Sequence, residues 1–242
     1  GLIVSVGVTV DSYVVYFERL KDEIRSGKTI RSSVDRGFQR AFRTILAADI
    51  SSFIGAALLD QLIAAGYQVR ALYRLRHGRV LQNAPGLTWV PGDLADRAAL
   101  AALVSGAESV VHCAGAVRGA RRADFDRVNE AGVRDIVQAA ADASGCRRFL
   151  LLSSLAAREP QLSDYAGSKR RGEQALAANA KGLAWTVLRP PAVYGPGDRE
   201  MLPVFRTMAR GLALIPGDGR GRLSLIYVDD LASAIVAWLA AD

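Results

Sequence analysis

Cysteine and histidine are scarce in this chain, whose 242 residues include two of each. Cys113 and Cys146 belong to no CxxC pair and to no His/Cys cluster with metal-ligand spacing. We therefore expect no metal site and no disulfide framework. Cys113 lies in an apolar run, which predicts a buried, reduced thiol and a reducing compartment such as the cytoplasm.

Long apolar runs without charge are also lacking. The most apolar stretches, 1–17 and 44–66, are both interrupted by aspartate, whereas a membrane-spanning helix needs roughly 20 apolar residues. The chain also opens without the basic segment of a signal peptide. We expect a cytoplasmic protein, with membrane contact through residues 1–43 as the less favoured alternative.

Aromatic residues make up only 7% of the chain, although the net charge is +7. A basic surface can attract nucleic acid, but no basic stripe interleaved with aromatics and no nucleic-acid-binding motif is present. We predict a solvated basic surface and no nucleic-acid partner. Hydrophobic residues amount to 50%, enough for one large domain with an appendage.

The chain changes character near residue 44. Residues 17–43 are rich in charge, and Phe17, Leu20 and Ile24 share one face of an amphipathic helix. A second helix is expected from Ser32 or Ser33 to about residue 43, so residues 1–43 are predicted to form a helical appendage.

From residue 44 onward, short apolar runs alternate with alanine-rich helical stretches. Strands are expected at 44–48, 67–74, 109–115, 148–154 and 184–190, and helices at 54–66, 96–104, 124–144 and 163–180. Such alternation is typical of βαβ units. We predict an α/β, Rossmann-like, doubly wound parallel sheet with helices on both faces.

Tyr165 and Lys169 form the sharpest chemical motif. They lie one helical turn apart, so the ammonium is expected to lower the pKa of the phenol and suit it to proton transfer. Ser153 and Ser154 end the preceding strand, where a hydroxyl can orient a substrate oxygen; we favour Ser154, with Ser153 as the substitute. A Tyr–Lys pair can also be a solvated helix face, and the position after a buried strand favours catalysis.

Eight segments extend this motif in a fixed order. They are FIGAALLDQLIAAGYQVRALYR, GDLAD, VVHCAG, VNEAG, LLSSLA, YAGSK, LRPPAVYGPGD and LIYVDDLASAI. Together they make residues 53–242 similar to the extended or atypical short-chain dehydrogenase/reductases, also called the NAD-dependent epimerase/dehydratase family.

This resemblance implies a role for each matching position. Tyr165 would be the acid/base, Lys169 would also hold the nicotinamide ribose, and Asn129 would be structural. The cofactor would further contact Phe53, Ile54, Gly55, Asp93, Leu94, Ala114, Gly115, Pro190 and Val193. The family resemblance also allows a homodimer.

The strand expected at 67–74 corresponds to the second strand of the family's sheet. Arg74 and Arg76 lie at its end, and no acidic residue does. Arginine suits the 2′-phosphate of NADP and an acid suits the ribose of NAD. NADP is therefore slightly favoured over NAD, and the alternative is that the arginines only add solubility.

The phosphate loop departs from the family's Gly-x-x-Gly-x-x-Gly pattern. Gly55 matches the third glycine, but Asp49 and Ser52 replace the first two. Two like charges about 4 Å apart repel by roughly 4 kcal/mol at an effective dielectric near 20. A carboxylate at residue 49 is thus expected to weaken binding of the pyrophosphate.

Residues 1–59 resemble the SecD/SecF protein-export subunits through the runs VDSYVVYFER and TILAAD. The two resemblances overlap at FIGAALL, as in a join between unrelated coding regions. We expect a SecD/SecF-like segment at 1–43 and a reductase domain at 44–242. Its substrate part is expected mainly at 190–225, with a C-terminus short for the family.

Three functions compete at this point. The first is an NAD(P)-dependent oxidoreductase or epimerase/dehydratase acting on a hydroxyl or carbonyl of a small molecule such as a nucleotide sugar, sterol or isoprenoid. The second is a non-catalytic binding module with an impaired phosphate loop, which Asp49 and Ser52 favour. The third, a protein-export component, ranks last because the remaining membrane helices of that family are missing.

Overall fold

The structure is a computed structural model that describes residues 51–74, 84–198, 201–212 and 223–241. The strand expected at 44–48 and the helices expected within 1–43 lie outside the described residues. Asp49 and Arg76 lie outside them as well.

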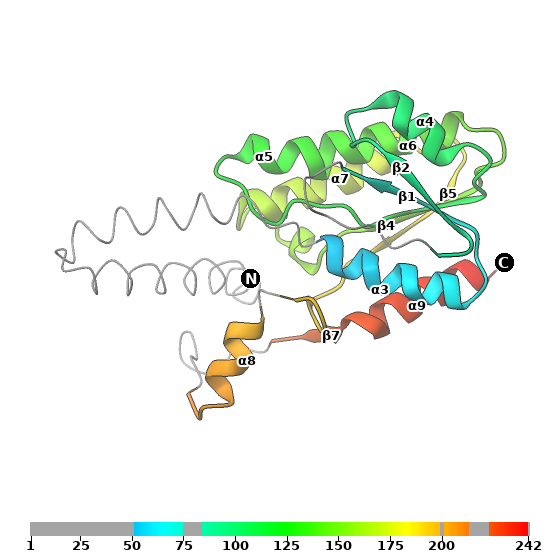
Figure 1. Ribbon diagram of the computed structural model, residues 1–242. Helices are drawn as coiled ribbons and strands as arrows, with labels where there is room; N and C mark the ends of the chain where they lie inside the picture. Colours follow the sequence, from blue (N-terminus) through cyan, green and yellow to red (C-terminus); the bar gives the residue numbers. More distant parts are fainter. Residues whose placement is uncertain (1–50, 75–83, 199–200, 213–222, 242) are drawn as a thin grey trace.

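Helices and strands alternate along the described chain (Figure 1). The strands are β1 (Val69–Tyr73), β2 (Leu87–Pro91), β3 (Ser109–His112), β4 (Arg148–Leu152), β5 (Ala184–Leu188), β6 (Ala192–Tyr194) and β7 (Leu225–Tyr227). The α-helices are α3 (Ser51–Ala64), α4 (Arg97–Val104), α5 (Arg122–Asp126), α6 (Gly132–Asp142), α7 (Asp164–Asn179), α8 (Leu202–Met208) and α9 (Val228–Ala240). A π-helix, η1 (Arg127–Ala131), and a 3₁₀ helix, η2 (Leu155–Arg158), complete the set.

Every strand pairing is parallel, as predicted. β1 pairs with β2, β4 lies between β3 and β5, and β6 pairs with β7. Among the described strands no ladder joins β1 to β3. The parallel direction brings the carboxyl ends of β3, β4 and β5 to one edge, where ligands bind in open α/β sheets.

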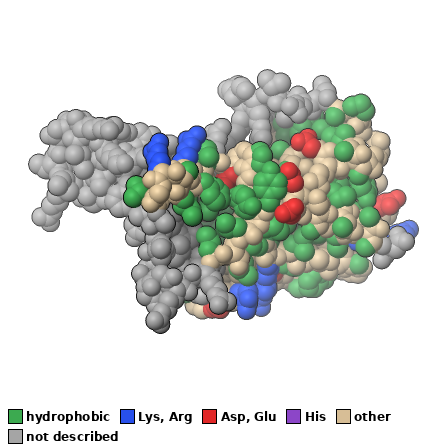
Figure 2. Space-filling model, turned by 90° about the horizontal axis from the view of Figure 1, so that it is seen from below, with side chains coloured by type: hydrophobic (Ala, Val, Ile, Leu, Met, Phe, Trp, Pro, Cys, Tyr) green, Lys and Arg blue, Asp and Glu red, His purple; other side chains and the backbone are tan. Residues whose placement is uncertain are grey.

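Strand β4 separates two hydrophobic cores, because successive side chains of a strand point to opposite faces. Phe149 and Leu151 pack with α4, α6 and α7, whereas Leu150 and Leu152 pack with α3 and α9. Helices therefore cover both faces of the sheet (Figure 1). Figure 2 shows the α3 and α9 side, on which apolar side chains alternate with a few acidic ones.

The helix expected over 124–144 is interrupted. α5 passes into the π-helix η1 and then into α6, so the continuous helix predicted from its pattern was wrong in its middle. A π-turn adds one residue to a helical turn and often marks a functional site. The π-turn places Asn129 in the interior, where it is 1% exposed. Strand β2 was missed because its five residues carry no long apolar run.

In the described part of the chain, no helix combines the length and apolarity that a membrane span requires.

Helix α7 approaches η1 very closely at Gly172. A Cβ at this position would lie 2.1 Å from the backbone oxygen of Asn129. Only glycine allows this approach, and it holds the helix that carries Tyr165 and Lys169 against η1.

Gly172→Ala is expected to lower the free energy of unfolding by about 1–3 kcal/mol, because overpacking must displace backbone. Helix propensity alone would favour alanine by about 1 kcal/mol. Gly55→Ala is the matched control, since no atom lies within 4 Å of its added Cβ. Urea denaturation followed by circular dichroism measures both; a Gly172→Ala protein as stable as wild type would contradict the close approach.

Candidate active site

Two serines at the end of β4 have different surroundings. Ser153 is 5% exposed, and its hydroxyl donates to Glu173 Oε1 at 2.6 Å. Ser154 is half-buried, caps η2 by accepting from the Ala156 N–H at 3.2 Å, and hydrogen-bonds the Tyr165 phenol. Because the Ser153 hydroxyl is hydrogen-bonded to the Glu173 carboxylate, the arrangement favours Ser154 as the serine that contacts a substrate.

Tyr165 lies in the first turn of α7, half-buried, with its ring 6.3 Å from that of Phe125. Burial raises the pKa of the phenol above its ordinary value, and the hydrogen bond with Ser154 offsets part of that rise. The expected lowering of this pKa was wrong, because desolvation by burial is the largest effect on the phenol. The phenol is therefore protonated at neutral pH.

Lys169 lies one helical turn after Tyr165 and is buried, with 8% of its surface exposed. Its ammonium donates to the carbonyl oxygen of Leu152 at 3.1 Å. Burial lowers the pKa of this amine to about 8. A Cβ added at Gly115 would lie 2.8 Å from Lys169 Nζ, so the chain after β3 passes directly beside the ammonium.

Asn129 ties the loop after β3 to α7. Its Oδ1 accepts from the Ala116 N–H at 2.8 Å, and its Nδ2 donates to the Ala116 carbonyl at 2.7 Å. The same amide donates to Ser168 Oγ at 2.9 Å. These bonds agree with a structural role and hold Gly115 and Lys169 near each other.

Sequence reasoning missed Glu173, which lies one turn beyond Lys169 on α7. Arg189 donates to both of its carboxylate oxygens, at 2.8 and 2.6 Å, and Arg170 donates at 3.2 Å. Hydrogen bonds from Arg189 and Ser153 hold the pKa of Glu173 below its ordinary value although burial opposes them. The cluster fixes α7 against the ends of β4 and β5, and the i, i+4 spacing from Lys169 was the available signal.

His112 and Cys113 end β3 close to Lys169. Burial and the ammonium together lower the pKa of His112 to about 3, so its ring is neutral. Burial raises the pKa of Cys113 to about 12, so the thiol is protonated, and Cys113 is a free, partly buried cysteine. His112 Nε2 is buried and has no hydrogen-bond partner among the described residues.

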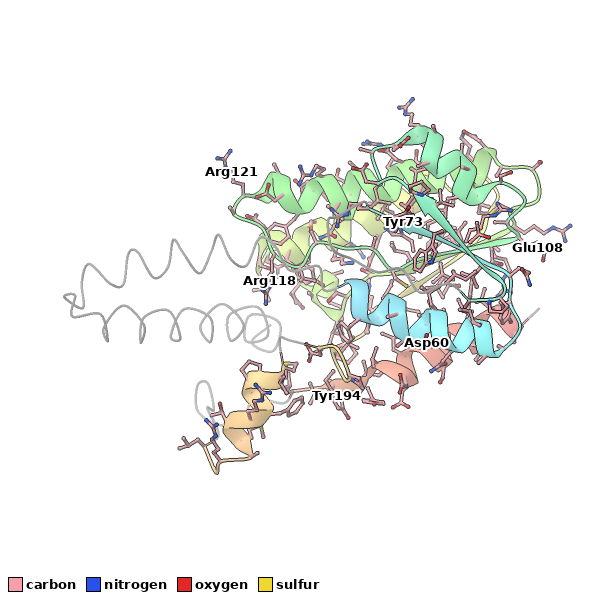
Figure 3. All side chains as sticks on the ribbon, in the orientation of Figure 1. Asp60, Tyr73, Glu108, Arg118, Arg121 and Tyr194 are labelled. Atoms are coloured by element: carbon pink, nitrogen blue, oxygen red, sulfur yellow. The ribbon has the colours of Figure 1, made fainter. Side chains whose placement is uncertain are left out.

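A cavity of about 2310 Å³ opens beside this group. Its lining includes Gly55, Arg74, Asp93, Leu94, Ala114 and Gly115, six of the positions predicted to contact cofactor. Tyr73 and Arg118, labelled in Figure 3, also line it near the carboxyl edge, and Glu108 lines it at the opposite end of the sheet. The cavity thus runs along the length of β1 and β3.

Four other predicted cofactor positions lie elsewhere. Ile54 is 8% exposed within the core under α3, and Phe53 and Val193 pack against the same core. Pro190 is buried, and its carbonyl accepts from the Leu155 N–H at 2.9 Å. None of these four lines the cavity, and their contact with cofactor stays a prediction.

The chain matches the profile of the NAD dependent epimerase/dehydratase family over residues 50–242. It belongs to that family. This confirms the resemblance predicted for residues 53–242 and, with the parallel sheet, the Rossmann-like fold.

Known relatives agree with both parts of the chain. A ceramide reductase of Caulobacter vibrioides is 40% identical over 189 residues, which cover 78% of this chain and 58% of that protein. SecD of Streptomyces coelicolor is 56% identical over 59 residues, covering 24% of this chain and 10% of SecD. The crystal structure of the dTDP-glucose 4,6-dehydratase DesIV of Streptomyces venezuelae, with NAD and TYD bound, has a TM-score of 0.66 and 26% identity, covering 78% and 69% of the two chains. The present chain therefore spans just over half the length of the ceramide reductase.

The lowered pKa of Lys169 predicts a pH-dependent stability. Its folded pKa, about 8, lies below the ordinary 10.5, so between these values the unfolded state holds more protons and stability rises with pH. At about 1.4 kcal/mol per pKa unit, burial of the charged amine lowers the free energy of unfolding by about 3 kcal/mol below pH 8.

Lys169→Met should therefore lack this component. From pH 7 to pH 10, the unfolding free energy of wild type is expected to rise relative to that of Lys169→Met. The exposed Lys181, paired with Asp142 at 2.9 Å, supplies the control Lys181→Met, whose difference should stay nearly flat. An equally flat difference for Lys169→Met, by urea denaturation, would contradict the burial of a titrating amine.

Proposed function

We propose that this chain carries the cofactor-binding and acid/base groups of an NAD(P)-dependent oxidoreductase that reduces a carbonyl or oxidises a hydroxyl. One observation carries the proposal: Tyr165, Ser154 and Lys169 meet at the carboxyl end of β4, beside a cavity that runs along β1 and β3. The reductase and dehydratase relatives support the same class of chemistry.

The residues along the cavity fit a dinucleotide. Gly115 has no side chain where one would strike the Lys169 ammonium, which leaves that ammonium open toward a ribose. Asp93 and Leu94 would flank the adenine, and Arg74 would lie where a 2′-phosphate favours NADP over NAD. The bound nicotinamide would supply or accept the hydride.

The protonation states suit reduction. Tyr165 holds its proton at neutral pH because burial raises its pKa, so it can donate that proton to the oxygen of a carbonyl as the oxygen gains negative charge. The hydrogen bond with Ser154 then stabilises the phenolate. Lys169, anchored on the Leu152 carbonyl, places a positive charge one turn away on the same helical face.

A lipid-like ketone is the favoured substrate class. The relative with 40% identity is a ceramide reductase. Exposed large apolar side chains also concentrate in and after α8, at Leu202, Met208, Leu212, Leu223 and Leu225. Such a surface suits an acyl chain better than a nucleotide sugar.

A binding module without turnover is the second candidate. It is favoured by the replacement of two loop glycines by Asp49 and Ser52. In this case the chain would bind a nucleotide weakly and the Tyr–Lys pair would remain unused.

Tyr165→Phe is expected to lower kcat for NADPH-dependent reduction of a long-chain ketone by roughly 10²–10⁴-fold, the usual contribution of a positioned acid. The Kd for NADPH should be unchanged. Tyr67→Phe, at the opposite end of β1, is the matched control and should keep wild-type turnover. If Tyr165→Phe retains the wild-type rate, the phenol is not the acid; if wild type binds NADPH without turnover, the binding module is favoured.

Asp49→Gly combined with Ser52→Gly is expected to tighten binding of NADPH by up to about a thousandfold, the equivalent of roughly 4 kcal/mol of relieved repulsion. Fluorescence titration with NADPH and NADH measures it, and a larger gain with NADPH would support the role of Arg74. Asp142→Asn, at the far end of α6, controls for the loss of one negative charge. An unchanged or weaker affinity in the double variant would remove the loop argument.

A further inference from the structure

The loop between β3 and α5 is fixed at both ends by hydrogen bonds from side chains to its backbone. At its start, Asn129 accepts from the Ala116 N–H at 2.8 Å and donates to the Ala116 carbonyl at 2.7 Å. At its end, the N–H groups of Ala120 and Arg121 both donate to Asp124 Oδ2 at 3.0 Å. The backbone between these points therefore has a defined shape, and a side chain at its centre has a defined position.

One aromatic ring separates the centre of this loop from Tyr165. A Cβ added at Gly119 would lie 2.8 Å from Asp124 Cβ and 3.0 Å from Phe125 Cε2, so the loop lies directly on Phe125. Phe125 is buried, and its ring lies 6.3 Å from the ring of Tyr165. The loop therefore packs next to the candidate acid/base group.

Arg118, at the centre of the loop, lines the cavity. It is half-buried, and Ala116 and Val117 before it line the cavity as well. Arg121, three residues later, is exposed and does not line the cavity. Figure 3 shows the two arginine side chains pointing in opposite directions. The loop thus presents one guanidinium to the cavity and another to the solvent.

Arginine outnumbers acidic residues along this edge of the cavity. Arg74 after β1, Arg118 after β3 and Arg127 on η1 line it, together with Asp93 and Asp124. Both carboxylates accept hydrogen bonds from backbone N–H groups, Asp93 from one and Asp124 from two. A hollow lined by an excess of one charge attracts ligands of the opposite charge, so this edge suits an anion.

We propose that Arg118 binds an acidic group, a carboxylate or a phosphate, of the carbonyl substrate. This assignment rests on the proposed function and narrows its substrate class from a lipid-like ketone to an amphiphile with an acidic group. Arginine suits the role because its planar fork can donate two parallel hydrogen bonds to a carboxylate or a phosphate. Since one aromatic ring separates the loop from Tyr165, the acidic group would be held near the carbonyl that the phenol protonates.

The pyrophosphate of the cofactor is a second anion that the cavity would hold. Pyrophosphates in doubly wound sheets bind at the amino end of the first helix, which here is α3, with Gly55 in the cavity lining. Arg118 instead follows β3 and lies in the loop that packs on Phe125. The affinity for NADPH therefore distinguishes an arginine that serves the substrate from one that serves the cofactor.

Calorimetric titration of the full chain with decanoate, decyl phosphate and decan-1-ol, with and without NADPH, tests the site. The probes share an alkyl chain and differ in the head group, so the tighter acidic probe identifies the carboxylate or the phosphate. That probe is expected to bind wild type roughly 10- to 100-fold more tightly than decan-1-ol, as a charge-assisted hydrogen bond allows. Equal affinities for all three probes in both cofactor states would overturn the proposal.

Substitutions in the loop assign the preference to one side chain. Arg118→Gln is expected to remove the preference for the acidic probe and to leave the affinity for decan-1-ol unchanged. Arg121→Gln is the matched control, because it removes the same charge from the same loop outside the cavity, and it should keep the wild-type preference. An equal loss in both variants would assign the preference to the net charge of +7 and overturn the proposal. A weaker Kd for NADPH in Arg118→Gln would assign the arginine to the cofactor and also overturn it.

Arg118→Lys covers the case in which Arg118→Gln does not fold. An ammonium keeps the charge but cannot form the two parallel hydrogen bonds of a guanidinium. The acidic probe is expected to bind this variant several-fold more weakly than wild type, with decan-1-ol unchanged. Wild-type affinity for the acidic probe in Arg118→Lys would overturn the bidentate contact.

Ketone reduction is measured separately, so that the binding site and the oxidoreductase fail in different ways. A preference for the acidic probe that depends on Arg118, in a chain that reduces no ketone, would support the site and contradict the oxidoreductase. Ketone reduction that depends on Tyr165, without any preference for an acidic probe, would support the oxidoreductase and overturn the site.

Discussion

Burial of β4 between two cores is the constraint on which this structure depends. Phe149 and Leu150 have no exposed surface although they point to opposite faces, so the strand can occupy only one place in the sheet. Its backbone is satisfied by β3 and β5. Where the apolar run ends, Ser153 and Ser154 follow at once, and Ser154 bonds Tyr165 while Lys169 bonds the Leu152 carbonyl. Hydrophobic burial of β4 therefore positions the candidate site.

Polar side chains around the carboxyl end of β4 hold helix α7 in place. Glu173 anchors the helix to Ser153 and Arg189, and Asn129 anchors it to the loop after β3. Tyr165 and Lys169 lie on the helix between these anchors.

The chain departs from its family's glycine pattern at Asp49, before α3, and at Ser52, in the first turn of α3. From α3 onward, residues fit the NAD dependent epimerase/dehydratase profile. Before α3, the sequence is similar to SecD.

Sequence alone determined the parallel α/β class, most strands and helices, and the Tyr165–Lys169 pair, because two-residue and 3.6-residue periodicities are local properties. It also separated residues 1–43 from the rest by charge. Only the tertiary structure showed that Ser153 bonds Glu173 while Ser154 bonds Tyr165, that the pKa of Tyr165 is raised, and that Glu173 and a π-turn at Asn129 lie beside them. Each of these depends on burial and on partners distant in sequence, and neither periodicity nor composition records which groups lose their water when the helices close on the sheet.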